Sequence, residues 1–285
     1  MEATAPRKAR KPYESDLSDA EWALLQPLLP PPVAAGAPRR TDLREVVNGI
    51  LYRLHNGCAW HALPHDLPRE GTVREYFHRW RRCGLWGRIN DTLRRAVRRA
   101  EGHDEEPSAA LVDSQSAKGS RTSGVRGYDA GKKVKGTKRH VLVDTLGLLL
   151  CVLVHPANIQ DRDGAKLLLA KAQGHFPRLQ LIWADGGYAG KLIAWAWRAC
   201  GWLIRIVRRP KGSKGWVLLP RRWVVERTFA WLSNCRALAR DYDYHPETSE
   251  ALVQVAMTHL MLRRLAKGAG AKRPQAQNPV NCTAA

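Results

Sequence analysis

The chain lacks any unbroken apolar run near the ~20 residues that a helix needs to cross a bilayer. Its basic beginning, residues 1–12, is followed by no apolar segment of the secretory type, so we expect no signal peptide. Its six cysteines lie far apart, with no CxxC pair and no zinc-ligand spacing, which indicates reduced thiols. No GxSxG motif supports a Ser-His-Asp hydrolase. We therefore expect a cytoplasmic protein with neither a membrane nor a small-molecule substrate as partner.

Acidic residues are also scarce. The 285 residues include 47 Lys and Arg against 26 Asp and Glu, for a formal net charge of +21. A folded surface with this excess carries a strong positive field, so nucleic acid is the expected partner. The hydrophobic content of 44% is enough for a buried core of one large domain or two modest ones.

The character of the sequence changes at residues 101–108, an acidic stretch with Gly and Pro, and we place a domain boundary there. The expected organisation is a basic flexible tail at 1–15, a helical DNA-binding domain at 16–104, a catalytic domain at 105–266 and a flexible tail at 267–285.

The first region has the hydrophobic periodicity of helices. Ser18 can cap one helix, Thr41 or Asp42 begins a second, and two more are expected over about 72–80 and 85–99. An arginine-rich helical unit is typical of a helix-turn-helix-like DNA binder, and the alternative is a packing domain with a solvated basic face. The arginines concerned are Arg69, Arg74, Arg79, Arg81, Arg82, Arg88, Arg94, Arg95, Arg98 and Arg99.

The second region alternates strands and helices, which predicts a mixed α/β fold. Strands are expected at 109–112, 140–144, 148–155, 179–184 and 202–207, and helices at 161–172, 192–199, 223–232 and 250–265. The turn at 145–147 joins two of these strands as a hairpin.

Three acids in this region are candidates for catalysis. Asp113 and Asp185 each follow an apolar strand, where open α/β sheets place their sites. Glu226 lies on a predicted helix, at the border of its apolar face. Clustered carboxylates repel one another and therefore favour a hard divalent cation, Mg²⁺ or Mn²⁺, which can promote in-line phosphoryl transfer.

Each acid also has a structural explanation. An isolated Asp after a strand is more often a cap or turn former, and Glu226 with Arg222 matches an ordinary i, i+4 pair. Asp144 and Asp161 compete for the metal, although a hairpin turn and a helix start explain them better. His140 and His155 are expected to pack or to form hydrogen bonds.

Two basic segments are predicted to contact DNA phosphates. The first is a glycine-containing loop over 118–139, for which a merely solvated loop is the alternative. Its cations are Lys118, Arg121, Arg126, Lys132, Lys133, Lys135, Lys138 and Arg139, and the second segment contributes Arg205, Arg208, Arg209, Lys211 and Lys214. Most tryptophans are expected in the core, and Trp216 is the best candidate to touch a base.

Several segments resemble the DDE transposases of bacterial insertion sequences, and within them the IS-five family. They are 111–116 (LVDSQS), 126–136 (RGYDAGKKVKG), 138–145 (KRHVLVDT), 184–188 (ADGGY) and 222–231 (RWVVERTFAW). The stretch 17–25 (LSDAEWALL) and residues 57–61 (GCAWH) resemble the helical domain that precedes catalysis in these enzymes.

This resemblance implies a ribonuclease-H-like catalytic domain in which Asp113, Asp185 and Glu226 hold two metal ions. It also implies binding of double-stranded DNA at terminal inverted repeats, cleavage, joining of the 3′ hydroxyl to target DNA, and at least a homodimer on DNA. Arg222 matches the arginine of the family signature, but Leu219 and Ser233 stand where tyrosine and lysine are expected. The alternatives are a nuclease of this fold without strand transfer and a catalytically silent DNA-binding relative.

Overall fold

The computed structural model describes residues 10–31, 41–121, 123–208 and 221–268. The helices are α1 (Asp19–Leu25), α2 (Leu43–Asn56), α3 (Glu70–Arg82), α4 (Leu85–Ala100), α5 (Asp161–Ala172), α6 (Lys191–Cys200), α7 (Trp223–Ser233), α8 (Arg236–Ala239) and α9 (Pro246–Lys267). The strands are β1 (Ala109–Lys118), β2 (Gly127–Asp129), β3 (Val134–Asp144), β4 (Leu149–Pro156), β5 (Leu181–Ala184) and β6 (Leu203–Ile206), with 3-10 turns η1 (Gln26–Leu28), η2 (Trp60–Ala62) and η3 (Gly186–Tyr188). Of the predicted tails at 1–15 and 267–285, residues 1–9 and 269–285 lie outside the described residues. Residues 10–15 are described and are held in place, since Arg10 pairs with Asp16 and with Glu45 of α2.

The strands form one mixed sheet. Its order is β2-β3-β1-β5-β6, and β4 also pairs with β3. β1 and β3 are antiparallel, as are β3 and β4, whereas β1, β5 and β6 are parallel to one another. The predicted mixed α/β class is therefore confirmed.

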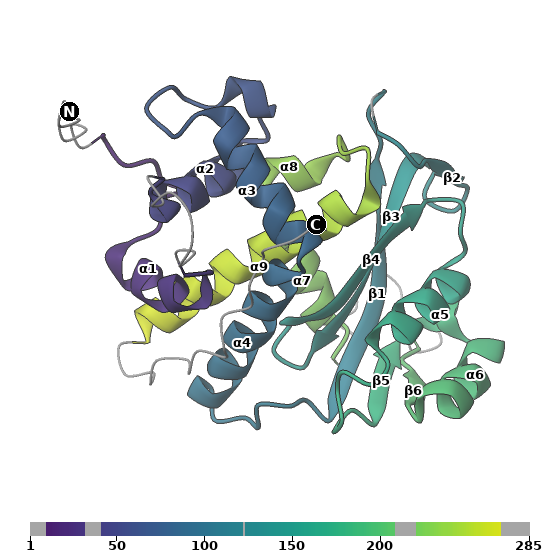
Figure 1. Cartoon of the computed structure of the whole chain (residues 1–285). Coiled ribbons are helices and arrows are strands. Elements are labelled where there is room, and N and C mark those ends of the chain that lie inside the picture. The colour runs from purple at the N-terminus through teal and green to yellow at the C-terminus, as the bar shows by residue number, and fades with distance from the viewer. Residues whose placement is uncertain (1–9, 32–40, 122, 209–220, 269–285) are drawn as a thin grey trace, which may run out of the picture.

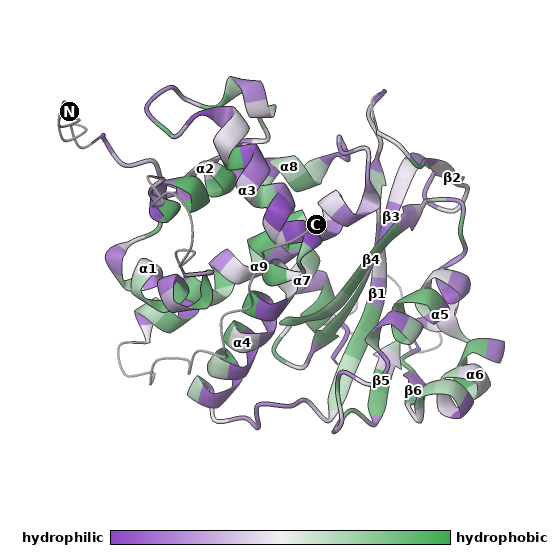
Figure 2. Cartoon of the chain, viewed as in Figure 1, coloured by the Kyte–Doolittle hydropathy of each residue, from purple (hydrophilic) through white to green (hydrophobic). Residues whose placement is uncertain are grey.

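Helices cover both faces of the sheet. α5 and α6 lie on one face, and α7 and α9 lie on the other together with the amino-terminal helices (Figure 1). Successive side chains of β1 point to opposite faces of the sheet. Leu111 packs in the larger hydrophobic core and Val112 in the smaller one. Figure 2 shows hydrophobic residues along β4 and β5, as expected for strands buried between helices.

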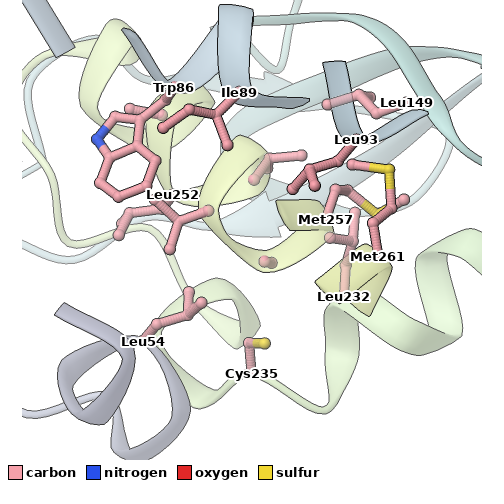
Figure 3. Close-up of a cluster of buried hydrophobic side chains, with 14 of the residues drawn as sticks. Leu54, Trp86, Ile89, Leu93, Leu149, Leu232, Cys235, Leu252, Met257 and Met261 are labelled. Atoms are coloured by element: carbon pink, nitrogen blue, oxygen red, sulfur yellow. The ribbon is translucent and has the colours of Figure 1, made fainter. Parts of the chain in front are cut away.

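One continuous core joins the amino-terminal helices to the rest of the chain. Figure 3 shows Leu54 of α2 and Trp86 of α4 packed with Leu232 of α7 and Leu252 of α9. The hydrophobic cluster thus contains residues from both sides of 101–108, the segment where we predicted a domain boundary. The division of the chain into separate folding units stays a prediction.

The arginines of α4 are more structural than the sequence indicated. Arg94 is fully buried, with ion pairs to Asp91 and Glu106, and Arg98 is buried against Asp144 at 2.7 Å. The acidic stretch therefore offsets part of the positive charge of the arginines of α4, in addition to connecting two regions. These two arginines are not part of a DNA-facing surface, which corrects that expectation.

The amino-terminal helices begin where the sequence predicted. Ser18 and Glu21 form a reciprocal capping box on α1, and the Asp42 side chain caps α2. The predicted basic loop at 118–139 is wrong in part, because it contains β2 and the first residues of β3. The short helix α8 was not predicted.

Candidate active site

Asp113 lies in the interior of β1, not at its carboxyl end as predicted. β1 continues to Lys118 because it remains paired with β3, whereas its pairing with β5 stops at Leu111. Asp113 is therefore next to the carboxyl end of β5 while its own strand continues. Its Oδ1 accepts a hydrogen bond from the Ser114 amide at 2.7 Å, and its side chain is 17% exposed.

Asp185 follows β5 directly, as the sequence predicted. Its Oδ1 accepts a hydrogen bond from the Gly187 amide at 2.8 Å and thereby caps η3. The other carboxylate oxygen, Oδ2, faces the guanidinium group of Arg222, and the side chain is 33% exposed. The parallel pairing of β1 and β5 thus places two acids side by side.

Glu226 lies on α7, which packs against β1. Val225, Phe229 and Leu232 are buried on the core side of this helix, as predicted from their spacing. Glu226 lies at the border of that face and is 51% exposed. The apolar residues of α7 therefore hold the third acid over the carboxyl end of β5.

Arg222 brings the three acids together. Its Nη2 atom lies 3.5 Å from Asp113 Oδ2, 3.7 Å from Asp185 Oδ2 and 3.8 Å from Glu226 Oε1. One guanidinium nitrogen is thus the common neighbour of carboxylates from a strand, a loop and a helix. The i, i+4 pair with Glu226 forms, but it is one part of a four-residue cluster.

The electrostatics of the cluster are unfavourable for full ionisation. Burial, with the neighbouring Asp185 carboxylate, raises the pKa of Asp113 to about 6, and the Ser114 amide and Arg222 oppose this shift only in part. Arg222 and Lys132, the cations that favour the ionised form of Asp113, do not balance the charge of three acids. The cluster therefore has the charge and the oxygen donors that a hard divalent cation prefers.

Within the described part of the chain, no three His, Cys, Asp or Glu side chains are close enough together to hold a metal ion. Each of the three carboxylates instead places one oxygen 3.5–3.8 Å from the guanidinium nitrogen between them. The three carboxylates nevertheless offer the oxygen donors that a divalent cation prefers. They surround one point, which the Arg222 guanidinium occupies here.

A second polar network lies behind the acids and was missed by sequence reasoning. Asp161 accepts hydrogen bonds from Ser114 Oγ and pairs with Lys138 Nζ, each at 2.9 Å. Lys138 also contacts Asp129, whose carboxylate accepts a hydrogen bond from Ser116 Oγ at 2.6 Å. The sequence signal that could have revealed this network is the alternation of side chains along β1. Ser114 and Ser116 are polar, yet they lie on the same buried face of the strand as Val112.

The two competing acids are structural in this fold. Asp161 takes part in the network with Lys138. Asp144 is fully buried, pairs with Arg98 and accepts hydrogen bonds from the amides of Leu146 and Leu148 in the hairpin turn. Neither acid joins the Arg222 cluster.

The two histidines form a buried pair, in agreement with the structural interpretation. His140 Nδ1 and His155 Nε2 are 2.8 Å apart, and His155 Nδ1 lies 2.9 Å from the Pro156 carbonyl, to which it donates. Burial lowers the pKa of both rings, to about 3 for His140. They are therefore neutral, and the ring of Tyr188 packs edge-on against His140.

The predicted phosphate-binding residues separate into three groups. The exposed ones are Lys118, Arg121, Arg126, Lys132, Lys133, Lys135, Arg205 and Arg208. Lys138 and Arg139 are buried in β3, which removes them from a DNA-facing surface and corrects that prediction. Arg209, Lys211, Lys214, Trp216 and Leu219 lie outside the described residues. Lys132 Nζ also donates to the Ser114 carbonyl at 3.0 Å, so this lysine approaches the acids.

Tryptophans divide between core and surface. Trp183 and Trp202 are buried, as expected, whereas Trp197 and Trp223 are exposed. Trp223 follows Arg222 directly, and the Arg227 guanidinium lies over its ring at 4.6 Å.

Among the described residues, none of the helices combines the length and the apolar composition that a membrane span requires.

A mixed sheet in this order, covered by helices on both faces and carrying acids on β1, after β5 and on α7, defines a ribonuclease-H-like domain. Residues 104–261 match the family described as "Transposase DDE domain", and residues 17–90 match "Putative transposase of IS4/5 family". The chain belongs to the DDE transposase family of bacterial insertion sequences, of the IS4/5 type.

Two proteins of Burkholderia cepacia are similar to parts of the chain. "Insertion element IS402 uncharacterized 16.2 kDa protein" is 31% identical over 131 residues, which cover 42% of this chain and 80% of that protein. "Putative transposase for insertion sequence element IS402" is 28% identical over 127 residues, which cover 42% of this chain and 60% of that protein. The chain thus spans less than two thirds of the length of the second relative.

Proposed function

We propose that this chain binds the terminal inverted repeats of an insertion sequence, cleaves phosphodiester bonds at the element's ends and transfers the 3′ hydroxyl ends to target DNA. The observation that carries this proposal is the approach of Asp113, Asp185 and Glu226 to a single atom of Arg222. Three acids from separate elements of the fold converge on this one atom.

Asp113, Asp185 and Glu226 would hold two Mg²⁺ ions, or Mn²⁺ in their place. When bound, such ions stabilise the attacking and leaving oxygens of an in-line displacement. Asp113 is the most constrained of the three ligands, since the Ser114 amide fixes one of its oxygens and directs the other toward Arg222. Asp185 is fixed in the same way by the Gly187 amide.

Arg222 has two roles in this proposal. In the protein alone it offsets the repulsion among the acids. With DNA bound, its planar guanidinium can turn to the scissile phosphate, because phosphate oxygens are bidentate acceptors for arginine. The exposed residues Lys118, Arg126, Lys133 and Lys135 would contact the backbone beyond that phosphate.

The amino-terminal helices would read the inverted repeats. Because two ends must be held together for transposition, we expect at least a homodimer on DNA. The packing of α4 on α9 would fix the position of the reading helices relative to the acids.

Cleavage of supercoiled DNA that carries the element's ends tests the site. We expect the wild type to cut with Mg²⁺ or Mn²⁺, and Asp113→Asn, Asp185→Asn and Glu226→Gln to bind DNA without cutting it. The matched control is Asp163→Asn, which changes an exposed acid of α5 and should leave cutting unchanged. Cutting that survives in all three site variants would mean that the acids are wrongly assigned.

Two further measurements separate the parts of the proposal. Calorimetric titration with Mn²⁺ should show binding to the wild type that is lost in Asp113→Asn, independently of any cleavage. A strand-transfer assay with labelled pre-cut ends distinguishes a transposase from a nuclease of the same fold. Ser233, which stands in the place of the family lysine, makes a catalytically silent protein the second candidate, and that protein would bind DNA but fail both assays.

A further inference from the structure

Residues 240–245, between α8 and α9, lie against the far end of β1. Asp241 forms a parallel bridge with Gly119, in which its amide donates to the Lys118 carbonyl at 2.9 Å and its carbonyl accepts from Ser120 at 2.8 Å. Gly124 packs so closely on the Tyr244 carbonyl that no side chain would fit there. Two segments far apart in the sequence therefore form one surface at this end of the sheet.

The side chains of this segment alternate between inside and outside. Asp241 is buried and accepts hydrogen bonds from Thr137 at 2.6 Å and Ser249 at 2.9 Å. Asp243 pairs with Arg53 of α2. The intervening Tyr242 and Tyr244 are 49% and 69% exposed. The aspartates thus anchor the segment and the tyrosines face solvent, although exposing two large rings gains nothing for the fold.

Cations lie beside the bridge between Asp241 and Gly119. Arg240 Nε donates to the Gly119 carbonyl at 3.3 Å and Arg126 Nη1 to the Ser120 carbonyl at 3.2 Å, which holds both guanidinium groups on the exposed side of the bridge. Lys118 is exposed at the same end of β1. The aspartates of the segment are turned inward, so its exposed charge is positive, with Glu247 the next exposed acid along the chain. Figure 2 shows this end of the sheet as predominantly hydrophilic.

We propose that Arg240, Tyr242 and Tyr244 extend the DNA contact of Lys118 and Arg126 into one surface, here named the tyrosine surface, which binds the backbone of a duplex. Lysine and arginine suit phosphates, and tyrosine contributes a hydroxyl donor with a ring that packs on sugars. The bridge and the buried aspartates hold these groups in place before DNA arrives, which limits the entropy lost on binding.

The position of the tyrosine surface fits DNA that also occupies the acid cluster. Lys118 is five steps along β1 from Asp113, a distance of about 17 Å at the usual rise of a strand. This equals about five base pairs of duplex DNA. Because five positions separate them, the Asp113 and Lys118 side chains leave β1 on opposite faces, so a duplex that contacts both passes over the end of the strand. This placement relative to the cut rests on the proposed function; the contact itself does not.

The salt dependence of binding to a 40-base-pair duplex of arbitrary sequence, measured without divalent cations, tests the contact. Replacing Arg240 with Gln should reduce the slope of log K against log salt by about 0.9, the contribution of one lost phosphate contact. Replacing Tyr242 and Tyr244 with Ala should weaken binding roughly two- to tenfold and leave the slope unchanged, because no charge is removed.

The controls use exposed residues of α6, which packs on α5 and β6. Arg198→Gln and Trp197→Ser should change neither slope nor affinity. If the tyrosine-surface variants keep the wild-type slope and affinity, the proposal fails. If they instead reduce the molar mass of the free protein in light scattering, the surface is an interface between two copies of the chain. Loss of catalysis cannot cause either result, because no cleavage takes place in this assay.

Discussion

Gly164 permits the close approach of α5 to the buried histidine pair. A Cβ atom at this position would lie 2.5 Å from His155 Nε2 and 2.7 Å from His140 Nδ1. Both rings are held in place by hydrogen bonds and cannot move aside. We expect Gly164→Ala to lower the free energy of unfolding by about 1–3 kcal/mol, as overpacking in a core does, measured by urea denaturation.

Gly71→Ala is the matched control, because Gly71 is also helical but a Cβ atom added there would meet no other atom within 4 Å. There the higher helix propensity of alanine should raise stability by up to about 1 kcal/mol. Equal effects of the two substitutions would show that the histidine pair does not restrict α5.

His259 should make the protein less stable in acid. Burial, together with Arg263 and His55, lowers the pKa of His259 to about 3, whereas an unfolded histidine titrates near 6.5. Between pH 6.5 and pH 3, His259 therefore binds a proton in the unfolded chain but not in the folded chain. Stability falls as the pH falls from 6.5 toward 3, by up to about 1.4 kcal/mol per pH unit from this residue.

Urea denaturation of the wild type and His259→Gln between pH 7 and pH 5 measures this contribution. We expect the variant to lose less stability with acidification than the wild type. His140, whose pKa burial lowers to about 3, should maintain part of the slope in both proteins. Parallel pH profiles for the two proteins would contradict the assignment of this proton to His259.

Single residues were predictable where the sequence placed a polar group after an apolar strand. Asp185 is such a case, and the structure places it where the pattern indicated. Lys138 and Arg139 were not predictable, because a cation in a basic stretch has the same local pattern whether it is exposed or neutralised by distant acids. The partner of Lys138, Asp161, is more than twenty residues away in the sequence.

At the scale of elements, α4 is tied to the hairpin of β3 and β4 by a buried ion pair. Arg98 Nη1 lies 2.7 Å from Asp144 Oδ2, and these side chains are 5% and 0% exposed. Arg98→Met should lower the free energy of unfolding by about 3–5 kcal/mol, because it leaves a buried carboxylate without its cation. Chemical denaturation at pH 7 measures this loss.

The neighbouring pair provides the control. Arg99 and Glu105 are 2.6 Å apart but nearly half-exposed, so Arg99→Met should cost no more than about 1 kcal/mol. A loss of the same size in both variants would show that burial does not decide the effect of these arginines.

The helices and most strands were predictable because hydrophobic period and capping residues are local signals. The extent of β1 was not, because Asp113 and the serines that follow interrupt its apolar pattern. Only pairing with β3 over nine residues shows that the strand continues to Lys118. The short α8 has too few residues to display a helical period.

For the whole molecule, the sequence indicated which faces are apolar but not what covers them. The stripes of α2 and α4 were visible, and a separate helical domain would have buried them equally well. In the structure they pack on α9, which comes from the other end of the chain. A pattern within one helix carries no information about its partner, so this arrangement could not be predicted.

The shared core predicts that the amino-terminal helices and the sheet unfold together. Met261 of α9 is fully buried among residues from both regions (Figure 3). Native-state hydrogen exchange on peptides from α4 and from β3 measures the free energy of opening in each region. Met261→Ala should lower this free energy by about 2–5 kcal/mol, and by the same amount in both regions. Leu167→Ala, at a half-exposed position of α5, should change either region by less than about 0.5 kcal/mol. A loss of protection confined to α4 would instead mean that the helices form a unit that opens without the sheet.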